Sequence, residues 1–197
     1  MEEIEIKFLD INPEFIKQKL VSLGAKKVGD FHYRRIVMDY PDFRLDKQCS
    51  WVRLRDEGDK VTLTFKQRLG TGDMRNNLTG DDGMYERETV VEDFEATHEI
   101  LLKIGLIEKM YQENKRTRYI LNDVEFDIDT WPLLKPYLEI EGKDWDTVNE
   151  AARKLGFDPK DGKKFSTNQI YRLNGLDDRN YTKMTFEEQI ERTGEKF

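Results

Sequence analysis

Apolar and polar residues alternate along much of this chain of 197 residues. The stretch Glu-Ile-Glu-Ile-Lys at residues 3–7 shows the pattern most clearly. A period of two places every second side chain on the same face of a β-strand. The pattern recurs and predicts strands at residues 2–9, 30–40, 50–56, 60–68, 84–91, 113–121, 124–131 and 137–142. The sequence therefore predicts a protein built mainly from strands.

Three segments have the period of an amphipathic helix instead. They are residues 14–25, 93–106 and 144–157. Gly24 suits the C-terminus of the first helix, Asp93 suits the N-cap of the second, and either Asp144 or Asp146 suits the N-cap of the third. Residues 166–176 fit a short helix or a strand. These segments predict an α+β fold.

The rest of the chain indicates one main domain. Residues 70–83 are rich in Gly, Asn and Asp, which is typical of a mobile surface loop. The regular pattern weakens beyond residue 165, and the last twenty residues are mostly charged. We therefore expect a domain at residues 1–175 and a charged C-terminal tail at residues 176–197, with room for a short helix.

The composition excludes some classes of protein. A net charge of −7 argues against general nucleic-acid binding, which depends on a basic surface. Cys49 is the single cysteine, so no internal disulfide can form. The acidic start lacks the features of a signal peptide, and no apolar stretch is long enough to span a bilayer. We expect a cytoplasmic protein without a membrane partner.

Charged residues are 37% of the chain, and on the predicted strands they occur as like-charged pairs two residues apart. The pairs are Glu3 and Glu5, Arg53 and Arg55, Glu86 and Glu88, Arg116 and Arg118, Asp127 and Asp129, and Glu139 and Glu141. Two such charges lie only about 6.5 to 7 Å apart on one strand face and repel each other. A solvated sheet face is the simpler explanation, but such a face usually mixes neutral and charged residues. The pairs favour a bound ligand.

The ligand can be inferred from the two kinds of pair. Neighbouring carboxylates suit a hard divalent cation, and neighbouring arginines suit phosphate oxygens. A metal-bound polyphosphate supplies both partners. If the sheet closes into a barrel with its charged face inward, the apolar face is outside, where the helices can cover it. This arrangement would place Ile4 and Ile6 beneath helices and Glu3, Glu5 and Lys7 inside.

The motifs resemble those of the CYTH superfamily, the triphosphate tunnel metalloenzymes. The resemblance spans roughly residues 1–175 and rests on seven motifs in the family's order. They are EIEIK at 3–7, VRLR at 52–55, LTFK at 63–66, ERE at 86–88, KRTR at 115–118, FDID at 126–129 and LEIE at 138–141. The resemblance implies a closed, eight-stranded antiparallel β-barrel whose charged interior binds a triphosphate with Mg²⁺ or Mn²⁺. Three or more helices are expected to cover it.

The resemblance also implies roles for individual residues. The metal ligands would be Glu3, Glu5, Glu88, Asp127, Asp129, Glu139 and Glu141. The phosphate-binding residues would be Lys7, Arg53, Arg55, Lys66, Arg116 and Arg118, with Lys7, Arg55 and Lys66 also catalytic. The period of two leaves open whether Arg116 and Arg118 or Lys115 and Thr117 face inward. Arg35 departs from the family pattern, because many relatives carry an acid there.

Three functions remain open at this point. Hydrolysis of a phosphoanhydride bond in an inorganic, thiamine or nucleoside triphosphate is the first, because it needs no site for a nucleobase. Cyclisation of ATP to cyclic AMP and pyrophosphate, as in class IV adenylyl cyclases, is the second. The third is a module that binds polyphosphate without turnover, although so many carboxylates favour an enzyme. The sequence leaves the subunit number open, a homodimer included.

Overall fold

The computed structural model describes residues 4–69 and 84–193, and most of them belong to one antiparallel sheet. Its main strands follow the order β1-β8-β7-β6-β2-β3-β4-β5. Their bounds are β1 Glu5–Phe8, β2 Lys26–Asp39, β3 Ser50–Asp56, β4 Val61–Arg68, β5 Met84–Val91, β6 Ile107–Leu121, β7 Val124–Thr130 and β8 Tyr137–Glu141. Two short strands, β9 (Tyr181–Met184) and β10 (Gln189–Glu191), extend the sheet from β6.

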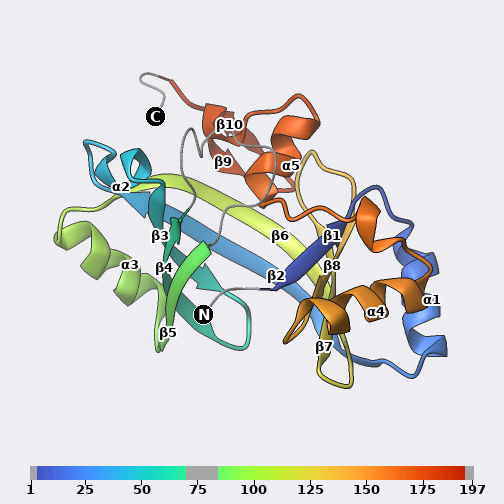
Figure 1. Ribbon diagram of the computed structural model, residues 1–197. Helices are drawn as coiled ribbons and strands as arrows, with labels where there is room; N and C mark the ends of the chain where they lie inside the picture. The colour runs from blue at the N-terminus through green and yellow to red at the C-terminus, as the bar shows by residue number, and fades with distance from the viewer. Residues whose placement is uncertain (1–3, 70–83, 194–197) are drawn as a thin grey trace.

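The sheet is curved but is not closed by hydrogen bonds. Strands β1 and β5 are its two edges, and within residues 4–69 and 84–193 they are not paired with each other. The predicted closed barrel is therefore not confirmed, whereas the predicted α+β class with an antiparallel sheet is. Figure 1 shows the long strands β2 and β6 crossing the molecule between these two edges. Side chains from both edges line the same cavity, so the sheet forms a trough.

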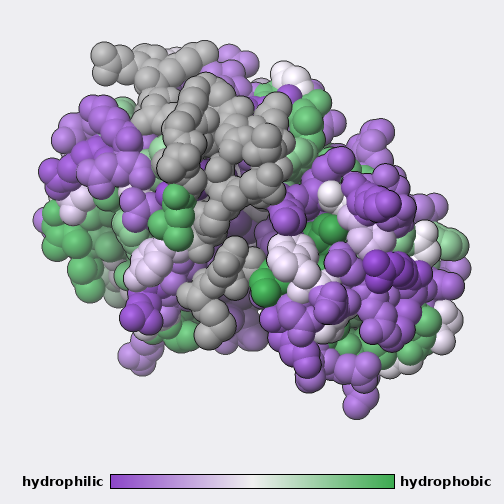
Figure 2. All heavy atoms as spheres, viewed as in Figure 1, coloured by the Kyte–Doolittle hydropathy of each residue, from purple (hydrophilic) through white to green (hydrophobic). Residues whose placement is uncertain are grey.

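The described residues include five α-helices and two 3-10 helices. They are α1 Pro13–Ser22, α2 Arg44–Lys47, α3 Phe94–Lys103, α4 Trp145–Leu155, α5 Thr167–Leu173, η1 Pro159–Asp161 and η2 Asp178–Asn180. In Figure 1, α1 and α4 lie at one end of the sheet and α3 at the other. Figure 2 shows apolar residues over α3, whose Ile100 side chain is exposed. The expectation of at least three covering helices is confirmed.

Local signals mark the helix ends, and the expected Gly24 and Asp93 are among them. Asn12 caps α1 by accepting hydrogen bonds from the backbone N–H groups of the first turn. Asp93 caps α3 in the same way. Of the two candidates for α4, Asp144 is the N-cap, because its Oδ1 accepts from the backbone N–H of Thr147 at 2.7 Å. Gly24 follows α1 with a φ of 84°, which favours glycine.

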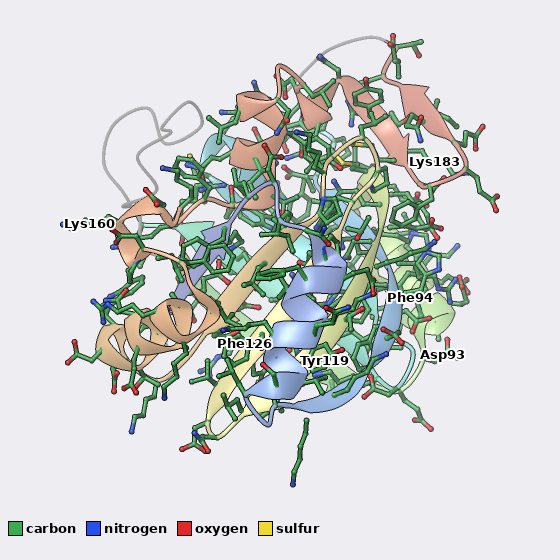
Figure 3. All side chains as sticks on the ribbon, turned by 90° about the vertical axis from the view of Figure 1, so that its right-hand side faces the viewer. Asp93, Phe94, Tyr119, Phe126, Lys160 and Lys183 are labelled. Carbon is green, nitrogen blue, oxygen red and sulfur yellow. The ribbon has the colours of Figure 1, made fainter. Side chains whose placement is uncertain are left out.

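The main hydrophobic core lies between the outer face of the sheet and helices α1 and α4. Ile6, on β1, is 4% exposed and belongs to this core. Tyr119 and Phe126, from β6 and β7, lie beside α1 (Figure 3) and are 4% and 1% exposed. Apolar side chains of these strands therefore point outward under helices. The charged residues that alternate with them must point to the inner face.

The C-terminal segment packs on the main sheet. Strand β9 runs parallel to β6, with Lys183 opposite Tyr111, and Met184 is 1% exposed in a core shared with α5. Residues 166–176 contain helix α5 (Thr167–Leu173), so the short helix, one of the two expected alternatives, is the one that forms. Residues 176–193 also form regular structure, whereas the division at residue 175 stays a prediction. The expected loop at 70–83 lies outside the described residues. No helix in the described part of the chain could cross a membrane.

Candidate functional site

A cavity of about 420 Å³ lies on the inner face of the curved sheet. Its lining includes side chains from all eight main strands and from α5 and η2. Glu5 and Lys7 line it, while Ile6 between them is buried in the outer core. This confirms the prediction for β1: its charged face points into the cavity and its apolar face points outward.

Three carboxylates meet at the β1 edge of the cavity. One oxygen from each of Glu5, Glu139 and Glu141 lies within 4.8 Å of the other two. Strand pairing brings them together, because β1 and β8 are antiparallel with Glu5 opposite Glu141 and Lys7 opposite Glu139. The Lys7 ammonium contacts Glu5 and lies 3.3 Å from Glu139. We call these three glutamates the carboxylate cluster.

The three glutamates of the carboxylate cluster repel one another, so a bound cation would stabilise their ionised forms. Burial and the neighbouring Glu139 raise the pKa of Glu5 to about 8. Burial opposes ionisation of Glu139 too, but Lys7 and Arg116 outweigh it and hold the pKa of Glu139 below its usual range. Carboxylate oxygens at this spacing are the donor set that Mg²⁺ and Mn²⁺ prefer. The residues present therefore fit a divalent cation.

A second group of charges comes from β6 and β7. Arg116 forms two 2.7 Å hydrogen bonds with the carboxylate of Asp129, and Arg118 forms bonds of 2.8 and 2.7 Å with Asp127. Lys115 and Thr117 lie on the opposite face of β6, where Thr117 donates to Asp30. Register thus decides the open alternative in favour of Arg116 and Arg118.

The facing wall is built by β3, β4 and β5. Arg53 lies 3.2 Å from Glu88, and Lys66 lies 2.5 Å from Glu86. Arg55 pairs with Glu57 at 2.5 Å. The cavity therefore has carboxylates and cations on both walls, and each wall is neutralised largely within itself.

The structure brings together some of the expected metal ligands but not all. Glu5, Glu139 and Glu141 converge, whereas Asp127 and Asp129 are held by arginines and Glu88 lies on the facing wall. Glu3 lies outside the described residues. The expected phosphate-binding residues all line the same cavity: Lys7, Arg53, Arg55, Lys66, Arg116 and Arg118.

Sequence reasoning missed several lining residues. Glu57, Lys109, Arg172, Asp178 and Arg179 also line the cavity. Most of them come from the first half of β6 and from the C-terminal segment, where no clear period was seen. Extending the period of two back along β6 from Arg116 would have reached Gln112 and Met110, which also line the cavity. It would not have reached Lys109, because the register of β6 shifts at that residue. The C-terminal residues gave no comparable signal.

Comparison with known families identifies the fold. A family model described as the CYTH domain matches residues 1–171. The chain belongs to the CYTH family. A search of curated protein sequences gives no match for this CYTH protein.

Solved structures share the fold of this CYTH protein. PH1012 from Pyrococcus horikoshii OT3 is 24% identical, with a TM-score of 0.67 over 85% of this chain and 98% of that one. A protein from Vibrio parahaemolyticus, described as a proposed adenylate cyclase, is 11% identical, with a TM-score of 0.70 over 87% and 98%. HpAC1 from Hippeastrum, described as a proposed adenylyl cyclase with a dominant triphosphatase activity, is 15% identical, with a TM-score of 0.63 over 89% and 97%.

Proposed function

We propose that this CYTH protein is a divalent-metal-dependent enzyme that hydrolyses a phosphoanhydride bond of a triphosphate. One observation carries the proposal: the carboxylate cluster and all six of the expected phosphate-binding side chains line one cavity. A solvated sheet face gives no reason for such convergence in a cavity that the C-terminal segment also lines. Family membership supports a triphosphate-related activity, and the description of HpAC1 names triphosphatase activity for that protein.

The carboxylate cluster is proposed as the metal site. Glu5, Glu139 and Glu141 supply hard oxygen donors, and a divalent cation bound to them would polarise the phosphate oxygens of the substrate. Lys7 lies between Glu5 and Glu139 and would contact a phosphate at the same edge. The cluster therefore determines where along the cavity the chemistry occurs.

The cationic residues are proposed to hold the phosphate chain. Arg53, Arg55 and Lys66 on one wall face Arg116 and Arg118 on the other. Guanidinium groups bind phosphate through paired N–H donors, and here they can stabilise the negative charge that develops on the leaving phosphate. Both sheet edges already line the cavity, so the proposal does not require a sheet closed by hydrogen bonds.

Phosphate release tests this proposal. Tripolyphosphate, thiamine triphosphate and ATP would be incubated with the protein in Mg²⁺, Mn²⁺ or EDTA, and the products would be separated. We expect metal-dependent release of phosphate from at least one substrate. Cyclic AMP and pyrophosphate from ATP would instead establish the cyclase reaction. Binding without turnover in either metal would establish a polyphosphate-binding module and overturn the proposal.

Two variants test the carboxylate cluster. Glu5→Gln and Glu141→Gln keep side-chain size but remove a metal-ligand charge, so each should lower the rate by at least about 100-fold. Glu150→Gln is the matched control, because Glu150 lies on the surface of α4 and pairs with Lys154 there. Full metal-dependent activity in both cluster variants would contradict this assignment of the site.

A further inference from the structure

Strand β2 contributes an arginine to the cavity that the proposed site does not use. Arg35 lines the cavity and is 8% exposed. Its neighbour on β3 is Arg55, and its neighbour on β6 is Gln112. Neither adjacent strand places a carboxylate opposite Arg35.

The contacts of Arg35 hold the side chain without neutralising it. One Nη donates to Oδ1 of Asn114, and the guanidinium carbon lies 4.4 Å from the ring centroid of Trp131. Its Nε is buried and has no hydrogen-bond partner in residues 4–69 and 84–193. A neutral amide and an aromatic ring therefore orient this cation, and the described part of the chain offers it no carboxylate within 4.0 Å.

Four of the arginines proposed to bind phosphate differ from Arg35 in this respect. Arg53, Arg55, Arg116 and Arg118 each have at least one carboxylate oxygen within 4.0 Å. Arg34, the next residue along β2, points to the opposite face and pairs with Asp56 at 3.0 Å and Glu95 at 3.1 Å. The lack of a carboxylate is thus specific to the inward position.

The surroundings of Arg35 oppose its charge. Burial, followed by repulsion from Arg55, Arg53 and Arg116, lowers its pKa well below the usual range for arginine. The attraction of Asp129 opposes this shift without cancelling it. An arginine side chain nevertheless keeps its proton in proteins. A buried cation without a counter-ion is costly, and an anionic ligand that enters the cavity removes that cost.

We propose that Arg35 is a phosphate-binding residue, positioned by Asn114 and Trp131, that donates hydrogen bonds from its guanidinium N–H groups to an oxygen of the bound polyphosphate. This inference rests on the proposed function, because it assigns an additional contact for the same ligand. It assigns to Arg35 a binding role that the like-charged pairs of the other strands did not reveal. Asn114 and Trp131 act on the ligand only through Arg35.

Calorimetric titration with tripolyphosphate tests the inference. Wild type, Arg35→Gln and Arg35→Met would be titrated in Mg²⁺ and again in EDTA, with Arg34→Gln as the matched control from the outer face of β2. Removal of one partner from a buried charge pair lowers affinity steeply, so both Arg35 variants should raise the Kd by at least about 30-fold. Arg34→Gln should bind like wild type.

Thermal melting separates a binding role from a structural one. Because Arg35 is a buried charge without a carboxylate partner, Arg35→Met should melt at the same temperature as wild type, or higher, when no ligand is present. Added tripolyphosphate should raise the melting temperature of Arg35→Met less than that of wild type. Arg35→Gln removes the charge but keeps an N–H donor near the position of the arginine Nε, so it tests the charge with a donor retained. A lower melting temperature in both variants with unchanged Kd would show that Arg35 only supports packing, and would overturn the inference.

The titration also distinguishes the two levels of proposal. If wild type binds and hydrolyses tripolyphosphate but the Arg35 variants bind it equally well, only the role of Arg35 is overturned. If wild type binds no tripolyphosphate even in Mg²⁺, the proposed function fails and the role of Arg35 fails with it.

Discussion

Replacement of Asp178 by Asn should stabilise the protein at neutral pH. Asp178 lies in the cavity lining, is 1% exposed, and has one carboxylate oxygen without a hydrogen-bond partner in the described part of the chain. Burial, together with repulsion from Asp177, raises its pKa from 3.8 to about 6, despite the nearby Arg172 and Arg179. Between about pH 4 and pH 6, the folded protein therefore keeps a proton on the Asp178 carboxyl that the unfolded chain has already lost.

The size and sign of the effect follow from this difference in pKa. Stability falls as the pH rises through this interval, because the unfolded state binds fewer protons there. A rise in pKa from 3.8 to about 6 corresponds to a cost of roughly 3 kcal/mol, complete above about pH 6. Asp178→Asn mimics the protonated carboxyl, so it should be more stable than wild type by up to roughly 3 kcal/mol at about pH 7.5, with no gain below about pH 4.

Urea unfolding across this pH range is the assay, and the neighbouring acid provides a control of opposite sign. Asp177 accepts hydrogen bonds from Arg179, which lower its pKa, so Asp177→Asn should lose stability at neutral pH. The reasoning is refuted if Asp178→Asn is no more stable than wild type at about pH 7.5. It is also refuted if the difference in the free energy of unfolding between Asp178→Asn and wild type is the same at about pH 4 as at about pH 7.5.

Two further predictions concern the packing and charge of the site. Arg116→Met leaves three buried carboxylates without this partner and should lower the free energy of unfolding by about 3–5 kcal/mol. The control Arg153→Met, at an exposed position of α4, should change it little. Urea unfolding that shows the same loss of unfolding free energy in both variants would contradict this prediction. Gly162→Ala would place a Cβ 2.2 Å from Cδ1 of the buried Ile6, so it should cost about 1–3 kcal/mol. An unchanged melting temperature would contradict this prediction and show that β1 can shift to accommodate the added methyl group.

Local patterns in the sequence determined the elements and their faces. Whether Glu5 and Lys7 share a face opposite Ile6 depends only on the period of a strand, so it could be predicted without knowing any partner strand. The N-caps Asp93 and Asp144 are equally local, because each cap bonds to the first turn of its own helix. The resemblance to the CYTH family, confirmed by the family match over residues 1–171, rested on motifs of this kind.

Strand pairing decided which charges meet. Glu5 and Glu141 are adjacent because β1 pairs with β8, a contact between the two ends of the domain that no local pattern reveals. The register of β6 against β7 placed Asp129 opposite Arg116, so that carboxylate lies in an ion pair rather than in the carboxylate cluster. Burial of Arg35 without a carboxylate depends on both of its neighbouring strands at once. Such contacts join residues that are far apart in the sequence, and they determine which charged side chains become buried next to one another. Only the tertiary structure contains them.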